Sequence, residues 1–466
     1  MGRSVSVGGG GPVDPDVPER YRVSPDFVPK DRYVDPGFLE LELERLFPHV
    51  WLNACRLEEV PDVGCFVELI VGDDSIVVVR TAAPTVKAYY NSCRHRGTRL
   101  LAGRGRVGEI RCPFHAWRWN LDGTFKHRPD DENFSPLSVP ELCLAECAVD
   151  TWGGWVFVNM SPDPEPLLDY LDPLPERLQG FGLEDMRYVW HKRFVLRANW
   201  KTAIDAFIEA YHVAGTHPQF LRPHLKPTTP ATMAEMRLLM PSLTETHGRH
   251  GRTLKQASDP GQAAAVEEAM ADAGVTPLQQ TAILVEYQLR ELQSLNTEWD
   301  RLALDRLAEV ELPPDPAEQH RLYLRTRREL AAAAGATLPD LDRQQIHAGA
   351  YDWHIFPNTI LLVTGNVGSL LGYRVLPRGH DPDSCVFDAW SMQIYAPGTV
   401  PAVELQEFND WRDGQVGELL GQDFANLHEV TVGMHSRSFA GLRINQRQET
   451  TIPHHHSVAD RFLFGA

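Results

Sequence analysis

The 466-residue chain has no long apolar segment and no recognisable leader peptide. No uninterrupted apolar run approaches the roughly 20 residues that a membrane-spanning helix requires. The N-terminus also has no basic stretch followed by an apolar core, which a secretory signal would need. These absences predict a cytoplasmic protein with no membrane partner.

Basic residues are fewer than acidic residues. Lys and Arg together number 45 against 63 Asp and Glu, which gives a formal net charge of −18. Binding to phosphates or to anionic lipids needs a basic footprint, so this balance argues against nucleic acid and anionic membranes as partners. Apolar residues make up 43% of the chain and charged residues 23%, as in ordinary globular proteins.

Cysteine is scarce as well, and two electron-transfer motifs are missing. Seven scattered cysteines, an odd number, do not form the framework of a disulfide-rich secreted protein. Reduced thiols, some of them bound to metal, are the better interpretation. The chain has neither a G-x-G-x-x-G nucleotide loop after a strand nor the C-x4-C-x2-C spacing of a plant-type ferredoxin. It is therefore not expected to take electrons from NAD(P)H by itself.

Changes in composition predict an α+β protein with two domains. Residues 1–47 begin as a poorly ordered arm rich in Gly, Pro and Asp, and end in a short helix over Phe38–Phe47. Residues 48–165 hold short apolar runs separated by turns, which is typical of a small antiparallel β domain. Residues 166–466 mix strands with helices, and the charged, Ala-rich segment at about 243–345 predicts a helical insertion. The helices expected in it cover Gly261–Ala271, Leu278–Leu295 and Ala317–Ala334.

The strongest signal is a pair of short segments in the β region, each with one cysteine and one histidine. Cys93 and His95 are one residue apart, and Cys112 and His115 follow after sixteen residues. Two such loops can close over one metal centre, and a Cys2His2 zinc site is the simplest alternative. Zinc-finger spacing groups the ligands by type, whereas each loop here contributes one thiolate and one imidazole. This favours a Rieske [2Fe–2S] centre, where one iron takes two Cys and the other two His.

With its flanks, this motif closely resembles the Rieske non-haem iron oxygenases, the aromatic ring-hydroxylating oxygenase α-subunit family. The matching flanks are Asn91–Gly97, Trp117 and Leu121–Gly123. One departure is Ala116, where the family usually has glycine, and we expect only a local backbone adjustment there. The resemblance implies a small all-β Rieske domain on a helix-grip catalytic domain, an antiparallel sheet with helices. It also implies a head-to-tail homotrimer, α3, with α3β3 as the alternative.

The second half of the chain contains a candidate site for a mononuclear metal. We expect a helix over Lys201–Val213, on which Glu209 and His212 share a face, with His217 at the helix exit. Two imidazoles so placed can converge on one ion, and a carboxylate would complete the 2-His-1-carboxylate triad of non-haem Fe(II) oxygenases. Taken alone, the pair is more simply a surface residue and a cap. Beside the first motif, it matches the family's E-x2-H-x4-H pattern.

The third ligand must be a carboxylate far downstream. Asp423 resembles the family's late acidic ligand, which lies on a helix shortly before a Gly-x-x-Ser element, here Gly433–Ser436. Asp410 and Asp413 are the alternatives, since a single Asp is most often a solvated surface residue.

The resemblance gives Glu209 a further role. The family needs a carboxylate that accepts hydrogen bonds from a Rieske histidine, His95 or His115, of one subunit and from an iron ligand, His212, of the next. Most members have Asp at this position, whereas members resembling carnitine and betaine oxygenases tend to have Glu. The residues that we expect to line a substrate cavity, with plain core packing as the alternative, are Phe207, Ile208, Tyr351 and Trp353.

Three functions remain open from the sequence. The first is the terminal oxygenase component of a multicomponent system, which hydroxylates an aromatic or other apolar small molecule with O₂ and electrons from a separate NAD(P)H reductase, with or without a ferredoxin. The second is a monooxygenase or demethylase acting on a quaternary ammonium or methoxy substrate, which Glu209 favours. The third is a Rieske electron carrier without oxygenase activity. The expected cofactors are one [2Fe–2S] cluster and one mononuclear non-haem Fe(II) per chain.

Overall fold

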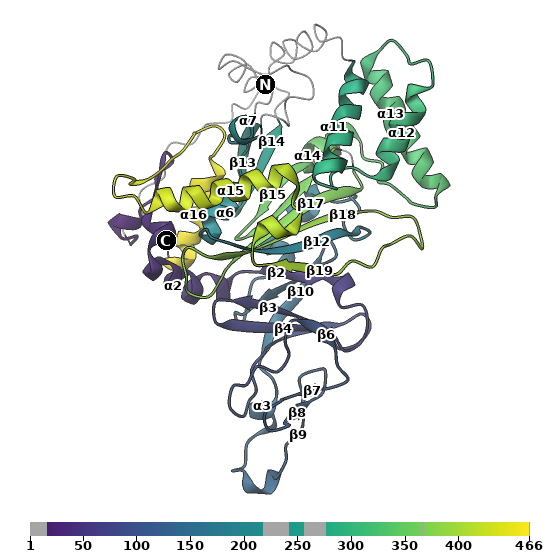
Figure 1. Cartoon of the computed structure of the whole chain (residues 1–466). Coiled ribbons are helices and arrows are strands. Elements are labelled where there is room, and N and C mark those ends of the chain that lie inside the picture. The colour runs from purple at the N-terminus through teal and green to yellow at the C-terminus, as the bar shows by residue number, and fades with distance from the viewer. Residues whose placement is uncertain (1–15, 218–241, 256–275, 366, 466) are drawn as a thin grey trace, which may run out of the picture.

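The computed structural model describes residues 16–217, 242–255, 276–365 and 367–465. It has a narrow stalk, built by the N-terminal third of the chain, that projects from a broad mixed α/β body (Figure 1). A group of helices stands apart at the upper edge of that body. The predicted α+β class is confirmed, with a small β domain and a larger domain of antiparallel sheet and helices.

A seven-stranded sheet forms the base of the stalk. Its strands, in spatial order, are β2 (Leu52–Arg56), β11 (Trp155–Asn159), β10 (Glu146–Trp152), β5 (Val86–Tyr90), β4 (Asp74–Arg80), β3 (Cys65–Val71) and β6 (Arg104–Arg106). The apolar run in β4 is buried on both faces of this sheet. Ile76 and Val78 join the main core, whereas Val77 and Val79 join a second core in the stalk. Gly72, at φ 57°, makes the tight turn between β3 and β4.

A three-stranded sheet forms the far end of the stalk. It consists of β7 (Ile110–Arg111), β8 (Arg118–Trp119) and β9 (Phe125–His127). The second core lies beneath it and contains Trp117 and Trp119 together with Cys93 and Cys112. The loops that carry the first motif are therefore mounted on their own small hydrophobic core.

An eight-stranded sheet organises the larger domain. Its order is β13 (Ser242–His247), β14 (His250–Lys255), β15 (Tyr351–Ile355), β16 (Thr359–Val363), β17 (Ser369–Pro377), β18 (Cys385–Gln393), β12 (Arg187–Leu196) and β19 (Leu405–Phe408). All neighbours are antiparallel except β12 and β19. Neighbouring residues of one strand point to opposite faces. Tyr373 accordingly packs on Phe207 on one face, while Arg374 reaches the stalk from the other.

Three helices lie on the face of the sheet that is turned away from the stalk. They are α6 (Trp200–Asp205), α15 (Gly417–Met434) and α16 (Thr451–Leu463), and they lie close together in Figure 1. The short helices of the described chain are α3 (Val139–Leu142), α4 (Leu167–Tyr170), α5 (Leu174–Arg177) and α7 (Val213–Thr216), with 3-10 turns at Glu19–Tyr21, Phe47–His49, Leu57–Glu59, Asp131–Asn133 and Trp411–Gly414. None of the helices in the described ranges has the length and apolar character that crossing a membrane requires.

The helical insertion begins later than the sequence predicts. Residues 243–255 are not part of it, because β13 and β14 belong to the main sheet. The described insertion helices are α11 (Pro277–Glu291), α12 (Glu298–Ala308), α13 (Pro316–Ala333) and α14 (Arg343–Gly349), and the first three enclose a small core of their own. The charged composition of β13 and β14 concealed their strand character. The helix predicted at Gly261–Ala271 lies outside the described residues.

The N-terminal arm is also more ordered than predicted, from residue 16 onward. Strand β1 (Phe27–Pro29) pairs with β20 (Gly441–Arg443), and Tyr33, in helix α1 (Asp31–Val34), is fully buried. Helix α2 (Pro36–Arg45) follows, with Asp35 as its N-cap. The prediction was wrong because the arm's partners lie some 400 residues away, where local composition gives no sign of them.

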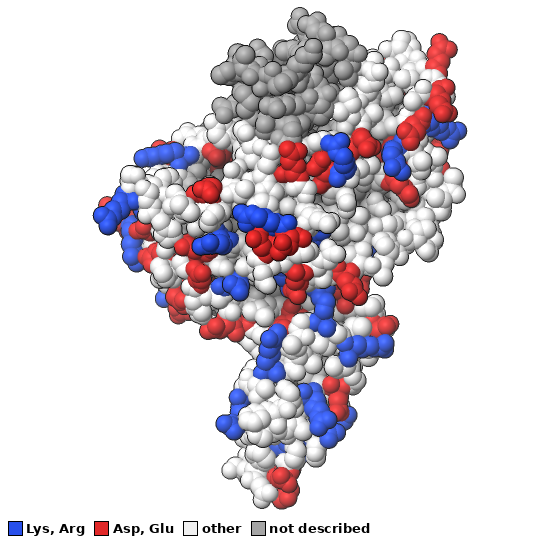
Figure 2. All heavy atoms as spheres, viewed as in Figure 1, with Lys and Arg blue, Asp and Glu red and all other residues white. Residues whose placement is uncertain are grey.

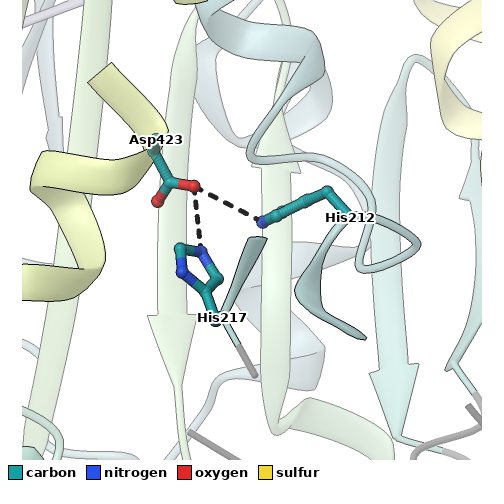
Figure 3. Close-up of side chains that lie close together, drawn as sticks. All are labelled: His212, His217 and Asp423. Atoms are coloured by element: carbon teal, nitrogen blue, oxygen red, sulfur yellow. Dashed lines mark ion pairs between the residues drawn. The ribbon is translucent and has the colours of Figure 1, made fainter. Parts of the chain in front are cut away.

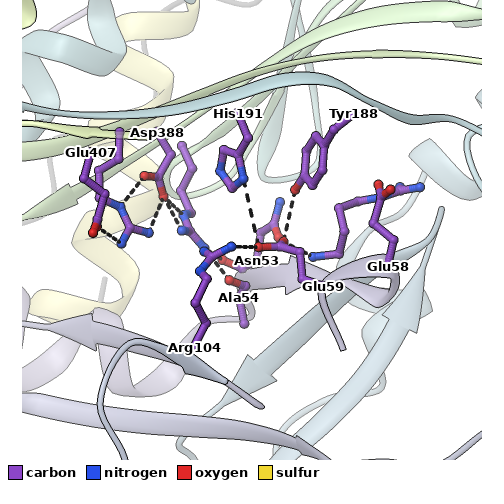
Figure 4. A network of polar contacts seen from close by, with 12 residues as sticks. Asn53, Ala54, Glu58, Glu59, Arg104, Tyr188, His191, Asp388 and Glu407 are labelled. Atoms are coloured by element: carbon purple, nitrogen blue, oxygen red, sulfur yellow. Dashed lines mark hydrogen bonds and ion pairs between the residues drawn. The ribbon is translucent and has the colours of Figure 1, made fainter. Parts of the chain in front are cut away.

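Buried charges join the stalk to the larger domain (Figure 4). Arg374 donates to the carbonyl oxygens of Asn53 and Ala54 at 2.5 and 2.7 Å and pairs with Asp388. Glu59 accepts from the Tyr188 hydroxyl at 3.0 Å and pairs with Arg104. These contacts tie the two domains together through groups that would be costly to leave unpaired.

Candidate metal centres

The two Cys/His loops meet at the end of the stalk. Each loop is closed by a backbone bond, from Cys93 N–H to Thr98 at 2.9 Å and from Cys112 N–H to Trp117 at 2.8 Å. The imidazole centroids of His95 and His115 are 4.7 Å apart. The Cys93 and Cys112 thiols lie within hydrogen-bonding contact of each other.

The donor atoms of this centre suit a cluster. The Nδ1 atoms of His95 and His115 are buried and have no hydrogen-bond partner among the described residues, as expected of nitrogens that bind a metal. Burial alone would raise the pKa of Cys112, but backbone N–H groups of His115 and Phe114 outweigh it and lower that pKa. Such donors stabilise a thiolate, the form that binds iron.

The substitution of alanine for glycine leaves the second loop intact. Ala116 adopts φ 59°, a left-handed conformation that costs an L-residue about 1 kcal/mol. Its N–H still bonds the Cys112 carbonyl at 3.2 Å. Next to it, the Trp117 ring stacks on His95 with an interplanar angle of 3° and a centroid distance of 5.0 Å.

The mononuclear site forms where the segment after α6 meets α15 (Figure 3). His217 Nε2 lies 2.9 Å from Asp423 Oδ1, and His212 Nε2 lies 3.7 Å from the same oxygen. The ligand atoms of the three residues all lie within 4.8 Å of one another. The alternatives Asp410 and Asp413 are exposed, and Asp410 caps a 3-10 turn instead.

The backbone around His212 differs from the predicted helix. Helix α6 ends at Asp205, and Glu209 lies in an irregular segment rather than on a helix face shared with His212. One oxygen of Glu209 accepts the backbone N–H groups of Tyr211 and His212. Because a side chain takes these two N–H groups, they do not form helical bonds to residues 207 and 208.

Each histidine of the triad is held by a second residue through its Nδ1 atom. Glu209 Oε1 lies 2.5 Å from His212 Nδ1, and Gln422 Oε1 lies 2.8 Å from His217 Nδ1. These contacts place the Nδ1 proton and leave Nε2 for a metal. Burial would lower the pKa of His212, but Glu209 outweighs it and raises the pKa to about 9. Sequence reasoning missed Gln422, although it directly precedes Asp423.

The structure separates the four residues that were expected to line a substrate cavity. Phe207 packs on Tyr373 and Phe387, with centroids 4.7 and 5.2 Å away, on the side of the helices and the triad. Ile208 is buried beside Phe207. Tyr373 was not predicted to belong to this group. Burial raises the pKa of its hydroxyl well above the usual value, and the nearby charge of Asp423 raises it further.

The other two residues gather around an arginine on the opposite face of the sheet. Trp353 donates its ring N–H to the Gly349 carbonyl at 2.8 Å and lies under the Arg252 guanidinium. Tyr351 is also close to Arg252, as its effect on the pKa of that arginine shows. Strand alternation explains this placement, because residue 352 lies between them and points toward the triad's face.

Comparison with known proteins agrees with both centres. Residues 50–145 match the Rieske [2Fe-2S] domain, and residues 183–296 and 305–465 match the ring hydroxylating alpha subunit (catalytic domain). The chain belongs to the ring-hydroxylating alpha subunit family. Membership implies a [2Fe–2S] cluster and a mononuclear non-haem iron, and the two donor sets described above fit these groups.

The individual relatives differ in what they oxidise. The chain is 33% identical over 203 residues to the glycine betaine monooxygenase oxygenase subunit of Chromohalobacter salexigens, covering 43% of this chain and 45% of that one. It is 30% identical over 194 residues to the biphenyl 2,3-dioxygenase subunit alpha of Rhodococcus jostii, covering 40% and 41%. The matched part thus spans about half the length of these relatives or less.

The fold is shared over nearly the whole chain. The structure of the quaternary ammonium Rieske monooxygenase CntA in complex with L-carnitine superposes with a TM-score of 0.61 at 17% identity, over 94% of this chain and 97% of that one.

Proposed function

We propose that the chain is the oxygenase component of a multicomponent Rieske system, which oxidises a small molecule with O₂. The observation that carries this proposal is the convergence of His212, His217 and Asp423 in a chain that also carries the paired Cys/His loops. A pure electron carrier has no need of the second site. Because the sequence lacks a nucleotide loop, the electrons must come from a separate NAD(P)H reductase, with or without a ferredoxin.

The side chains of the second site have distinct roles. A bound iron would supply the centre at which O₂ is activated, with open positions left by three protein ligands. Glu209 and Gln422 orient the two imidazoles, and Asp423 contributes the negative charge. The rings of Phe207, Tyr373 and Phe387 exclude water from that face of the sheet.

Electron transfer is proposed to run between subunits. In Figure 1 the loop between β7 and β8 and the segment that leads into α7 lie at opposite ends of the molecule. A head-to-tail homotrimer, with or without a β-subunit, would bring His95 or His115 of the partner subunit to Glu209, which contacts His212 in its own chain. Glu209 would then bridge the two centres.

Monooxygenation of a quaternary ammonium compound is the favoured reaction. The similarity to a glycine betaine monooxygenase supports it. Glu209 also favours it, because the family resemblance implies Asp at this position in most members. Oxygen insertion into an N-methyl group would release formaldehyde and the demethylated amine. Hydroxylation of an aromatic ring is the second candidate, favoured by the similarity to a biphenyl dioxygenase and by the aromatic side chains beside the triad.

Product analysis with labelled O₂ tests this proposal. The purified chain, an NADH-dependent reductase and ¹⁸O₂ are incubated with glycine betaine, carnitine and biphenyl in turn. The expected result is formaldehyde and a demethylated amine from a quaternary substrate, and no product from the His212→Ala variant. A labelled cis-diol from biphenyl alone would establish the second candidate. Full reduction of the cluster without oxidation of any substrate would leave only an electron carrier.

A further inference from the structure

A chain of buried hydrogen bonds leads from the N-terminal segment to the end of helix α6. Arg32 Nε donates to His456 Nδ1 at 3.0 Å, and His456 Nε2 lies 2.8 Å from the Tyr33 hydroxyl. The Tyr33 hydroxyl in turn lies 2.6 Å from Asp205 Oδ2. All four side chains are buried, and they come from α1, α16 and α6.

The protons in this chain can be arranged in one way. A guanidinium N–H always donates, so Nδ1 of His456 must accept, and the single proton of the neutral ring lies on Nε2. The ring is neutral because burial and the nearby Arg32 hold its pKa well below the usual value. Nε2–H therefore donates to Tyr33, and Tyr33 donates its own proton to Asp205. Every donor points toward this carboxyl group.

The other oxygen of Asp205 lies near two further carboxylates. Oδ1 is buried and has no hydrogen-bond partner among the described residues. Glu209 and Glu449 both lie close enough to raise the pKa of Asp205, and Glu209 also raises that of Glu449. The nearest cation, Lys201, is already paired with the buried Glu42 at 2.7 Å. Of the remaining charged neighbours, Arg32 pairs with Asp460.

Neighbouring carboxylates repel one another when all are ionised, and a proton on one of them removes that repulsion. Burial is the largest effect on Asp205, and although Tyr33 and Lys201 oppose it, the pKa rises to about 7. Glu209 accepts two backbone N–H groups and contacts His212 Nδ1. Glu449 accepts the N–H of Asn445 at 2.6 Å. Asp205 Oδ1 alone has no donor among the described residues, so the proton belongs on this oxygen.

We propose that Asp205 is a positioning residue that carries a proton on Oδ1 and so leaves the negative charge on Glu209, the residue that holds His212. The Arg32–His456–Tyr33 chain fixes Oδ2 as the accepting oxygen and thereby keeps Oδ1 for the proton. This inference deepens the proposed role of Glu209 and rests on it. Ionisation of Asp205 would add a second negative charge near Glu209 and would disfavour the arrangement in which Glu209 holds His212.

Infrared spectroscopy of the intact protein tests where the proton is. The carbonyl stretch of a protonated carboxylic acid should titrate with a midpoint near 7 and should be absent from Asp205→Asn. It should persist in Asp74→Asn, a matched control at a half-buried carboxyl on the stalk. In Tyr33→Phe the midpoint should rise, because a donor to the charged form is lost. A spectrum without a band that is specific to Asp205, or an unchanged midpoint in Tyr33→Phe, would overturn the proposal.

The pH dependence of turnover supplies a second readout. The side chain of Asp205→Asn is neutral at every pH, whereas wild-type Asp205, with a pKa near 7, loses its proton between pH 6 and pH 8. The turnover rate of the variant divided by that of the wild type should therefore rise about tenfold over this range. A ratio that stays constant contradicts the positioning role. The infrared titration needs neither bound iron nor a substrate, so failure of the oxygenase function leaves that part of the test standing, and the two failures can be told apart.

Discussion

Glu209 and Gln422 form a natural pair for testing electron transfer, because each holds one iron ligand through its Nδ1 atom. The contacts are 2.5 Å for Glu209 to His212 and 2.8 Å for Gln422 to His217. Loss of such a partner usually costs 10- to 100-fold in metal affinity, or about 1.4–2.7 kcal/mol. Both Glu209→Ala and Gln422→Ala should therefore bind iron more weakly by similar amounts.

The two variants should differ once excess Fe(II) has restored the metal. Gln422→Ala should then recover most of its activity, since Gln422 serves only to orient a ring. Glu209→Ala should stay inactive, because the proposed bridge to the partner subunit's cluster is gone. With both centres loaded, its single-turnover rate should still be more than about 100-fold below that of the wild type.

The assay is stopped-flow absorbance of the reduced cluster after mixing with O₂ and substrate. Iron analysis of the same samples confirms that both centres are loaded. Equal recovery of the two variants on iron loading would refute the bridge and reduce Glu209 to an orienting residue.

Three other variants test the acidic metal ligand, the second Cys/His loop and a buried histidine. Asp423→Ala should lose mononuclear iron while keeping the visible spectrum of the cluster, whereas the exposed Asp413→Ala should lose neither; unchanged metal content in the first variant would move the ligand elsewhere. Ala116→Gly should raise the free energy of unfolding by a few tenths to about 1 kcal/mol, and the thermal midpoint with it, because it relieves a left-handed alanine; a lower midpoint would show that φ 59° carries no strain. Burial lowers the pKa of His191 to about 4, so the unfolded chain takes up a proton first as the pH falls. The free energy of unfolding should therefore decrease as the pH falls from about 6.5 to 4. Urea titrations should show a smaller pH dependence of this free energy in His191→Gln than in the wild type, and an equal dependence in both proteins would contradict the prediction.

The local parts of this molecule could be predicted from the sequence. The Cys93–His95 and Cys112–His115 loops are short, and their ligand types and spacing specify the centre that they surround. The same holds for the spacing of His212 and His217. Asp423 was accessible only through the resemblance to a family, because nothing in the sequence near it says that α15 returns to the histidines.

What could not be predicted depends on contacts between distant segments. Tyr33 becomes a buried donor to Asp205 only because the N-terminal segment packs on α16, more than 400 residues away. Trp353 was expected beside the substrate, but its position in β15 turns it to the opposite face. The irregular backbone before His212 includes a contact that spacing does not reveal, in which Glu209 accepts the N–H groups of the residues that follow it. Periodicity and composition carry none of this information.

The presence of two different iron centres in one chain can be tested by measuring iron and acid-labile sulfide together on the purified protein after anaerobic loading with Fe(II). We expect about three irons and about two sulfides per chain, and loss of about one iron but no sulfide in His217→Ala. About two irons in both proteins, or zinc in place of the iron and sulfide, would contradict it.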